Sequence, residues 1–267
     1  MTQFNTTYNA GMNSLTLVFS DINGTLIDFD TYAYEGSFDA VQRLKAAGIP
    51  LILCSSNNKA EIQPLREAFE LQQAYIVENG SAIYNSDGTV MWQGASRKNI
   101  QSAISMIRDE TGLVFETFAD IPVARIRRET KRDSHSAALA LQHQHSELIV
   151  TQFDIHDFQL FKTACQQHGY DAVRGKQYIN VVAPGVNKGR AIQRMVRHIQ
   201  DQGHPLATIG IGDNVNDISM FEVVDQAYIV QLSRGRGWAK VDVPGLIRID
   251  AEGPAGFTLM VDMILGG

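Results

Sequence analysis

The clearest pattern near the start of the chain is an apolar run over 15–19 that ends at Ser20 and Asp21. A short continuous run of this kind is typical of a strand buried on both faces of a parallel sheet. Helical and strand patterns alternate after it: a helix from about 37 to Gly48, a strand at 50–54, a helix at 59–69 and a strand at 74–77. This βαβαβ order predicts a doubly wound α/β fold with a mostly parallel, Rossmann-like sheet.

The pattern changes after Gly80. Two short apolar segments, 82–84 and 90–92, flank the sequence Asn-Ser-Asp-Gly at 85–88, which is a strong hairpin signal. Hairpins belong to antiparallel sheets, so a second domain is expected to begin here. Helical patterns and short strands then alternate, with helices near 99–111 and 153–167 and strands near 147–150 and 178–182.

The parallel pattern resumes in the last third of the chain. It predicts a helix over 188–200, a strand over 207–212, a helix over 216–223 and a strand over 226–230. We therefore expect a split core, 1–84 plus 187–267, around an inserted α+β cap domain at 85–186.

Composition narrows the function classes. The 267 residues are 44% hydrophobic, which is ample for a substantial core. A net charge of −6 predicts neither nucleic acid nor a membrane as partner, and nothing in the sequence predicts an oligomeric state. The polar start of the chain does not resemble a signal peptide, and Cys54 and Cys165 fit buried thiols, so a cytoplasmic protein is expected.

Polar residues follow the predicted core strands where ligands of open α/β sheets gather. Asp21 and Gly24 follow the first strand, Ser55 follows the second, Lys188 opens a later helix, and the segment 212–217 follows a fourth strand. A carboxylate can attack phosphorus, and the oxygen ligands of 212–217 suit Mg²⁺, which can reduce its repulsion from a phosphate dianion.

Each cluster also has an ordinary structural interpretation. Asp21 could cap a turn, the loop 212–217 could cap a helix, Ser55 could be structural and Lys188 could be solvated. What favours chemistry is their joint placement, because nucleophile, donor, cation and metal ligands each follow a separate element at one edge of one sheet.

The order Asp21-Ile22-Asn23-Gly24-Thr25, then Ser55, then Lys188, then Gly212-Asp213-Asn214-Val215-Asn216-Asp217 resembles the four motifs of haloacid dehalogenase-like phosphatases. An insert between the Ser and Lys motifs looks like the large α/β cap of the sugar-phosphatase branch. The segments 53–56, 78–80, 145–148, 174–178 and 252–254 are similar to those of mannosyl-3-phosphoglycerate phosphatases.

The resemblance implies a mechanism. Asp21 would be the nucleophile, and Mg²⁺ would be held by its carboxylate, the backbone carbonyl of Asn23 and Asp213. Asn216 and Asp217 would support the water shell of the metal, while Ser55 and Lys188 would hold the phosphoryl group.

One position departs from the family pattern. Asn23 stands where the family has an Asp that protonates the leaving oxygen and later deprotonates the attacking water. This predicts an impaired or engineered phosphatase.

The expected substrate is a small phosphorylated sugar or glycoside, with mannosyl-3-phosphoglycerate as the first candidate. The residues expected to contact it are Ser56, Glu78, Asn79, Arg128, His145, Ser146, Lys176, Gln177 and Tyr178. Arg128 belongs to a basic run that could face an acidic substrate group, although a solvated helix face is the favoured interpretation. His143 could contact a substrate without forming a metal site. The alternatives are a phosphatase for another sugar phosphate and a catalytically impaired phosphosugar-binding protein.

Overall fold

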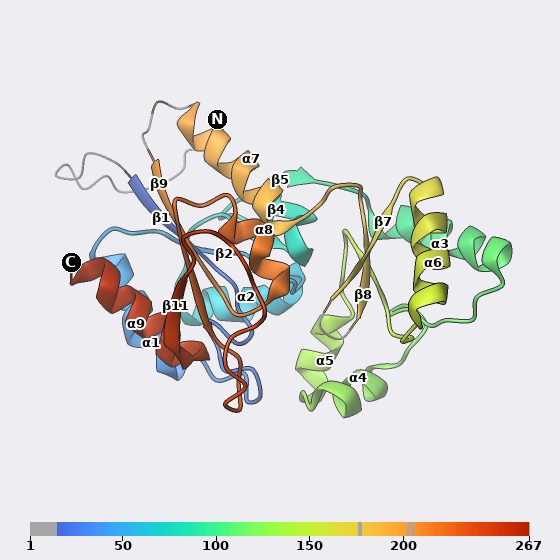
Figure 1. Ribbon diagram of the computed structural model, residues 1–267, viewed down its shortest axis with the longest axis horizontal. Helices are drawn as coiled ribbons and strands as arrows, with labels where there is room; N and C mark the ends of the chain where they lie inside the picture. Colours follow the sequence, from blue (N-terminus) through green and yellow to red (C-terminus); the bar gives the residue numbers. More distant parts are fainter. Residues whose placement is uncertain (1–14, 176–177, 202, 204–205, 267) are drawn as a thin grey trace.

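The central feature of the fold is a five-stranded sheet, seen in a computed structural model that describes residues 15–175, 178–201, 203 and 206–266 (Figure 1). Its strand order is β11-β10-β9-β1-β2, and every neighbouring pair is parallel. The strands are β1 (Leu15–Ser20), β2 (Leu51–Leu53), β9 (Leu206–Gly212), β10 (Gln226–Gln231) and β11 (Ile247–Glu252). The predicted α/β class with a mostly parallel sheet is confirmed.

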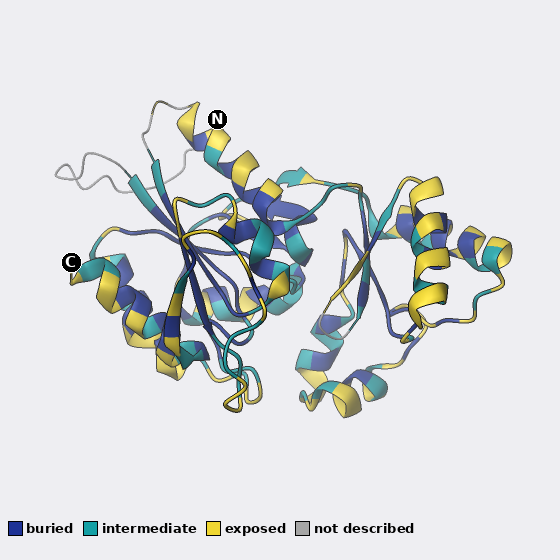
Figure 2. Cartoon of the chain, in the orientation of Figure 1, coloured by how far each residue is buried: buried dark blue, intermediate teal, exposed yellow. Residues whose placement is uncertain are grey.

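Helices cover both faces of this sheet, as a doubly wound fold requires. One face packs against α1 (Glu35–Ala46), α2 (Lys59–Ala68) and α9 (Gly253–Leu265), and the other against α7 (Lys188–Gln200) and α8 (Ile218–Phe221). The buried side chains lie along the sheet and on the helix faces turned to it, whereas the outward faces are exposed (Figure 2). The helix α9 and the strand β11 were not predicted individually.

The register of the sheet aligns the carboxyl ends of three strands. Ser20 pairs with Leu53 on β2 and with Ile211 on β9. The backbone N–H of Asp21 donates to the carbonyl of Ile211, and that of Cys54 donates to the carbonyl of Ser20. The residues that follow β1, β2 and β9 are therefore held at one edge.

The strand β3 (Tyr75–Val77) differs from its prediction as a third strand of the parallel sheet. It forms an antiparallel sheet with β4 (Ala82–Tyr84) and β5 (Val90–Gln93), and a single bridge, Cys54 to Ile76, joins it to the parallel region. The reason is the short 3₁₀ turn η1 (Glu78–Gly80), whose three positive φ angles reverse the chain.

The predicted hairpin packs on the core. Met91 and Trp92 of β5 lie against the apolar cluster that contains α7, and a Cβ placed on Gly94 would lie 3.0 Å from the Cβ of Ala183. The two chain crossings between core and insert are thus adjacent. We keep the split core and inserted cap as a proposal, and these contacts favour a first boundary near 94 rather than at 85.

The insert has its own antiparallel sheet, β6-β8-β7, made of Glu147–Ile149, Ile179–Val182 and Asp171–Arg174. One cluster of apolar side chains joins it to α3 (Arg97–Thr111) and α6 (Ile155–Gln167). A second cluster joins it to α4 (Val123–Thr130) and α5 (Ser134–Ala140), and α5 also contacts α2 of the core (Figure 1). Within the described ranges, no helix is long and apolar enough to cross a membrane.

Candidate active site

The centre of the site is a buried ammonium group between two carboxylates. Nζ of Lys188 lies 2.5 Å from Oδ1 of Asp21 and 2.6 Å from Oδ1 of Asp217. Burial by itself disfavours the ammonium form, but the two carboxylates outweigh this effect and raise the pKa of Lys188. Lys188 therefore stays charged at the edge of the sheet, where a phosphoryl group would need a positive partner.

Backbone geometry fixes the position of each member. Asp21 follows β1 directly, and Lys188 opens α7 after its N-cap, Asn187. Gly80 allows the 3₁₀ turn to pack against this N-cap, because a Cβ at Gly80 would lie 2.3 Å from the carbonyl oxygen of Asn187. The start of α7 is thus held in place by the turn after β3.

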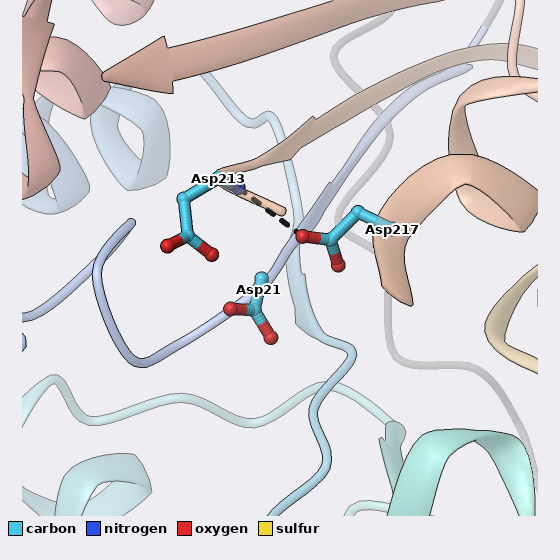
Figure 3. A group of neighbouring side chains, drawn as sticks. All are labelled: Asp21, Asp213 and Asp217. Carbon is cyan, nitrogen blue, oxygen red and sulfur yellow. Dashed lines mark hydrogen bonds between the residues drawn. The ribbon is translucent and has the colours of Figure 1, made fainter. Parts of the chain in front are cut away.

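The loop after β9 carries Asp217 and adds a third carboxylate, that of Asp213. Oδ2 of Asp217 accepts hydrogen bonds from the backbone N–H groups of Asp213 and Asn214, both at 3.1 Å. Carboxylate oxygens of Asp21, Asp213 and Asp217 lie within 4.8 Å of one another, and the three side chains converge from separate segments (Figure 3). All three are buried.

This donor set fits a magnesium ion. Mg²⁺ prefers hard oxygen ligands and is bound through one or two carboxylates together with water and phosphate oxygens. Asp217 is already bound to Lys188 and to two backbone N–H groups, so Asp21 and Asp213 are better placed as direct ligands. A Cβ on Gly24 would lie 2.8 Å from Oδ2 of Asp213, so only glycine lets the two loops approach this closely.

Polar groups on the loop after β2 complete the core side of the site. The Ser55 hydroxyl is buried and accepts a hydrogen bond from the backbone N–H of Asn57. The side-chain amide of Asn57 in turn accepts from Nδ2 of Asn23 at 2.8 Å. The turn residue Asn79 is joined to the same loop, because its N–H donates to the carbonyl of Ser55.

A cavity of about 200 Å³ lies between this edge and the cap. Asp21, Asp213 and Asn216 line it from the core, and Ser56 and Asn79 lie on the same wall. The cap side is formed by residues that include Phe118, Ile126, Arg132, His143, Leu148 and Tyr178. The site is therefore built by both parts of the chain.

The predicted substrate residues lie in different places. Ser56, Asn79 and Tyr178 line the cavity together with Asp21, Asn23, Asp213 and Asn216 of the predicted metal site, whereas Asp217 is buried outside the lining. Arg128 is exposed and also lies outside the lining. Glu78, His145 and Ser146 are buried behind the cavity wall, where they bond to other protein groups. Lys176 and Gln177 lie outside the described residues.

Glu78 of the core binds four consecutive residues of the cap. Its carboxylate accepts hydrogen bonds from the backbone N–H groups of Gln144 and His145 and from the Ser146 hydroxyl, and it lies 3.2 Å from Nδ1 of His143. Burial opposes ionisation of Glu78, but His143 and these hydrogen bonds outweigh it and lower the pKa to about 2. Glu78 is thus a charged clamp rather than a group open to substrate.

Two cavity residues were not among the main substrate residues expected from sequence. His143, which was expected only as a residue that could contact a substrate, lines the cavity directly. Arg132 is bound to Glu61 of α2 at 2.5 Å and stacks over the ring of Tyr32. The start of α2 was predictable, because Asn58-x-x-Glu61 is a capping-box signature. The ion pair between Glu61 and Arg132 was not, because only folding brings the two residues together.

Sequence and structure comparisons agree with this geometry. A model of the family described as haloacid dehalogenase-like hydrolase matches residues 18–234. Two curated relatives are both named glucosyl-3-phosphoglycerate/mannosyl-3-phosphoglycerate phosphatase. The protein from Methanococcoides burtonii is 26% identical and the one from Persephonella marina 25%; the alignments cover 94% and 93% of this chain and 97% of each relative.

The fold is shared with solved structures. A haloacid dehalogenase-like hydrolase from Bacteroides thetaiotaomicron superimposes with a TM-score of 0.69 at 18% identity, over 94% of this chain and 99% of that one. At that identity the likeness establishes the fold alone. The family model, in contrast, spans most of the chain and all four motifs carried by Asp21, Ser55, Lys188 and Asp213. The chain belongs to the haloacid dehalogenase-like hydrolase family.

Proposed function

We propose that this protein is a Mg²⁺-dependent phosphoric monoester hydrolase that uses Asp21 as its nucleophile. The observation that carries the proposal is the contact of Asp21 with the buried Lys188, beside Asp213 and at the wall of a cavity closed by the cap. The ammonium group of Lys188 fixes the position of this carboxylate, and attack on phosphorus requires a positioned nucleophile.

The reaction has two steps. In the first, an oxygen of Asp21 bonds to phosphorus, the bond from phosphorus to the leaving oxygen breaks, and that oxygen takes up a proton from water, because Asn23 cannot supply one. In the second, a water molecule attacks the phosphorus of the aspartyl phosphate and loses a proton to solvent, and the bond from phosphorus to Asp21 breaks, which releases inorganic phosphate and restores the carboxylate. Lys188 and Ser55 would hold the phosphoryl oxygens, and the cap would exclude bulk water.

A magnesium ion would be held by Asp21, Asp213 and the backbone carbonyl of Asn23. Asn216, at the wall of the cavity, and Asp217 would orient its bound waters. When bound, the ion would reduce the repulsion between the carboxylate and the phosphate dianion.

The proposed substrate is a phosphorylated glycoside, with mannosyl-3-phosphoglycerate or its glucosyl analogue as first candidates. The names of the two relatives support this choice, and so does a cavity that combines apolar cap residues with Asn79, Arg132 and His143. A cytoplasmic location is part of the proposal and rests on the two buried free thiols, Cys54 and Cys165.

One observation favours a second candidate, a phosphosugar-binding protein with little turnover. Asn23 cannot exchange a proton at neutral pH, and its Nδ2 donates to Asn57, so it can occupy the acid/base position without acting there. The binding groups remain intact in this case.

The decisive experiment is a screen of phosphate esters with the unaltered protein, with and without Mg²⁺. The matched control is Asp21→Asn, which keeps the size of the side chain and removes the nucleophilic charge. We expect Mg²⁺-dependent release of phosphate that Asp21→Asn abolishes. Undiminished hydrolysis by Asp21→Asn, or in excess chelator, would contradict the mechanism, and binding without release would favour the second candidate.

A further inference from the structure

A histidine of the cap faces the cavity with one ring nitrogen while its other nitrogen is held from behind. Nδ1 of His143 lies 2.9 Å from the Ser146 hydroxyl and 3.2 Å from Oε2 of Glu78. The Ser146 hydroxyl itself donates to Oε2 of Glu78 at 2.6 Å. Two acceptor oxygens therefore face Nδ1, which must carry a hydrogen.

The opposite nitrogen, Nε2, has no hydrogen-bond partner in the part of the chain that the structure describes, and it is not a buried atom. The residue as a whole is only 6% exposed and lines the cavity. The side of the ring that is not held thus meets the space where a ligand would lie.

The charged groups around the ring favour its protonated form. Burial disfavours the imidazolium, but the adjacent carboxylate of Glu78 outweighs burial and raises the pKa of His143, with help from Glu61 and opposition from Arg97. In this form Nε2 carries a hydrogen and points a charge-assisted donor at the cavity.

The loop that carries His143 is braced on two sides. Arg97 binds Glu147 through two nitrogens, at 2.7 and 3.0 Å, and also donates to the carbonyl of Leu141. On the other side, Glu78 accepts from the backbone N–H groups of Gln144 and His145. Such bracing is expected of a side chain that must keep one orientation.

The next residue of the core adds an acceptor. Asn79 follows Glu78 directly, lines the cavity, and has a buried Oδ1 atom with no hydrogen-bond partner among the described residues. Its backbone is left-handed, with φ 56°, as is that of Glu78, with φ 49°. Strained backbone of this kind persists where the surrounding contacts hold it and is concentrated at ligand sites.

We infer that His143 is a specificity-determining residue, which donates a hydrogen bond from Nε2 to an oxygen of the non-phosphate part of the substrate, with Glu78 as its positioning residue and Asn79 as a neighbouring acceptor. The inference rests on the proposed function for the existence of a phosphorylated substrate. It assigns the ligand class as one that carries hydroxyl or carboxylate oxygens beyond the phosphate.

Binding measurements test this without depending on turnover. Calorimetry in the presence of Mg²⁺ would compare glucosyl-3-phosphoglycerate, 3-phosphoglycerate and inorganic phosphate as probes. A hydrogen bond to a charged group contributes roughly 1.5–3 kcal/mol, so His143→Phe should weaken the glycoside at least about tenfold and inorganic phosphate less than about twofold. If His143→Phe weakens binding of the glycoside alone, the oxygen that accepts the hydrogen bond belongs to the sugar. If it weakens binding of both the glycoside and 3-phosphoglycerate, that oxygen belongs to the glycerate.

A second variant guards against a merely structural effect. Glu78→Gln keeps the shape of the clamp but lowers the pKa of His143, so glycoside binding should weaken at a lower pH than in the unaltered protein. Titration of the phosphate group of a given probe is the same for both proteins, so it cancels when their pH profiles for that probe are compared. His143→Gln, which keeps a donor, should restore part of the affinity lost in His143→Phe.

The inference is overturned if His143→Phe weakens all three probes equally, if it weakens none, or if the pH profile of Glu78→Gln matches that of the unaltered protein. Failure of the proposed function has a different signature. In that case the unaltered protein binds the glycoside, but neither the unaltered protein nor Asn23→Asp releases phosphate from any ester.

Discussion

The side-chain amide of Asn23 donates a 2.8 Å hydrogen bond to Oδ1 of Asn57, and both residues line the cavity beside Asp21. An aspartate at position 23 could keep this contact, because the amide of Asn57 can turn over and donate in the opposite direction. The carboxylate would therefore fit the existing site without a change in backbone.

Asn23→Asp should raise the turnover of sugar phosphates at least about tenfold, because general acid/base catalysis contributes roughly 10²–10⁴-fold. An aryl phosphate should gain less, since its leaving group needs little protonation. Steady-state hydrolysis of matched sugar and aryl esters at saturating Mg²⁺ measures both effects. The double variant with Asp21→Asn is the control, and equal sugar-phosphate rates for the unaltered protein and Asn23→Asp would mean that another residue supplies the proton.

Lys188→Met should abolish hydrolysis and also destabilise the fold. The change leaves Asp21 and Asp217 buried without their cation, and loss of one partner from a buried ion pair typically costs about 3–5 kcal/mol. Urea unfolding of the variant and of Lys240→Met, which removes an exposed lysine, measures the difference. An unchanged free energy of unfolding in Lys188→Met would show that the two carboxylates are not both ionised.

Arg132→Met should raise KM for a sugar phosphate several-fold by removing a contact between cap and core. Arg132 binds Glu61 of α2 and lies over the ring of Tyr32, so the cap would lose one of its anchors at the cavity. Arg128→Met is the matched control, because Arg128 is exposed and outside the cavity lining. If both variants change KM equally, the effect is one of net charge and not of the anchor.

Glu78 should make the stability of the protein depend on acid pH. Its pKa of about 2 in the folded state lies below the ordinary value of 4.5, so its contribution is present above about pH 4.5 and is lost as the pH falls toward 2. A difference of this size corresponds to at most about 3.5 kcal/mol. Urea unfolding of the unaltered protein and Glu78→Gln should therefore give free energies that converge from pH 7 to pH 3, and a gap that stays constant would contradict the assignment.

The raised pKa of His143 should make the stability of the protein fall as the pH rises, which is the opposite of the effect of Glu78. The contribution of His143 to stability is present below the ordinary value of 6.5 and is lost as the pH rises through the higher folded value. The same series, extended to alkaline pH with His143→Gln as control, should show this second loss. If the stability of the unaltered protein falls no more steeply with pH than that of His143→Gln, the ion pair between His143 and Glu78 is contradicted.

The parallel core was predictable because its strands are continuous apolar runs and polar residues follow each of them. Asp21, Ser55 and Asp213 could be grouped from sequence alone, since the carboxyl ends of neighbouring parallel strands share one edge. The misplaced strand β3 shows the limit of this reasoning. Three consecutive buried apolar residues are compatible with either a parallel or an antiparallel sheet. The hydrophobic pattern also does not reveal the left-handed backbone conformation of Glu78 and Asn79.

The cap wall was harder to predict because its contacts join residues far apart in the chain. Glu78 and His143 are 65 positions apart, so the sequence carried no signal that these two residues would pair. Periodicity likewise could not assign α4, whose basic residues fit a solvated helix, although Ile126 on the same helix lines the cavity.

The adjacency of the two chain crossings, with Gly94 packed against Ala183, would let the proposed insert be exchanged as a unit. The two cut ends of the core would lie as close together as neighbouring strands, so a short peptide could join them. Evolution could exchange such a unit in one step, and a laboratory could do the same. The edge that carries Asp21 would then serve a cap with a different specificity. Glu78 would remain in the core, and the replacement would have to supply new partners for its buried carboxylate.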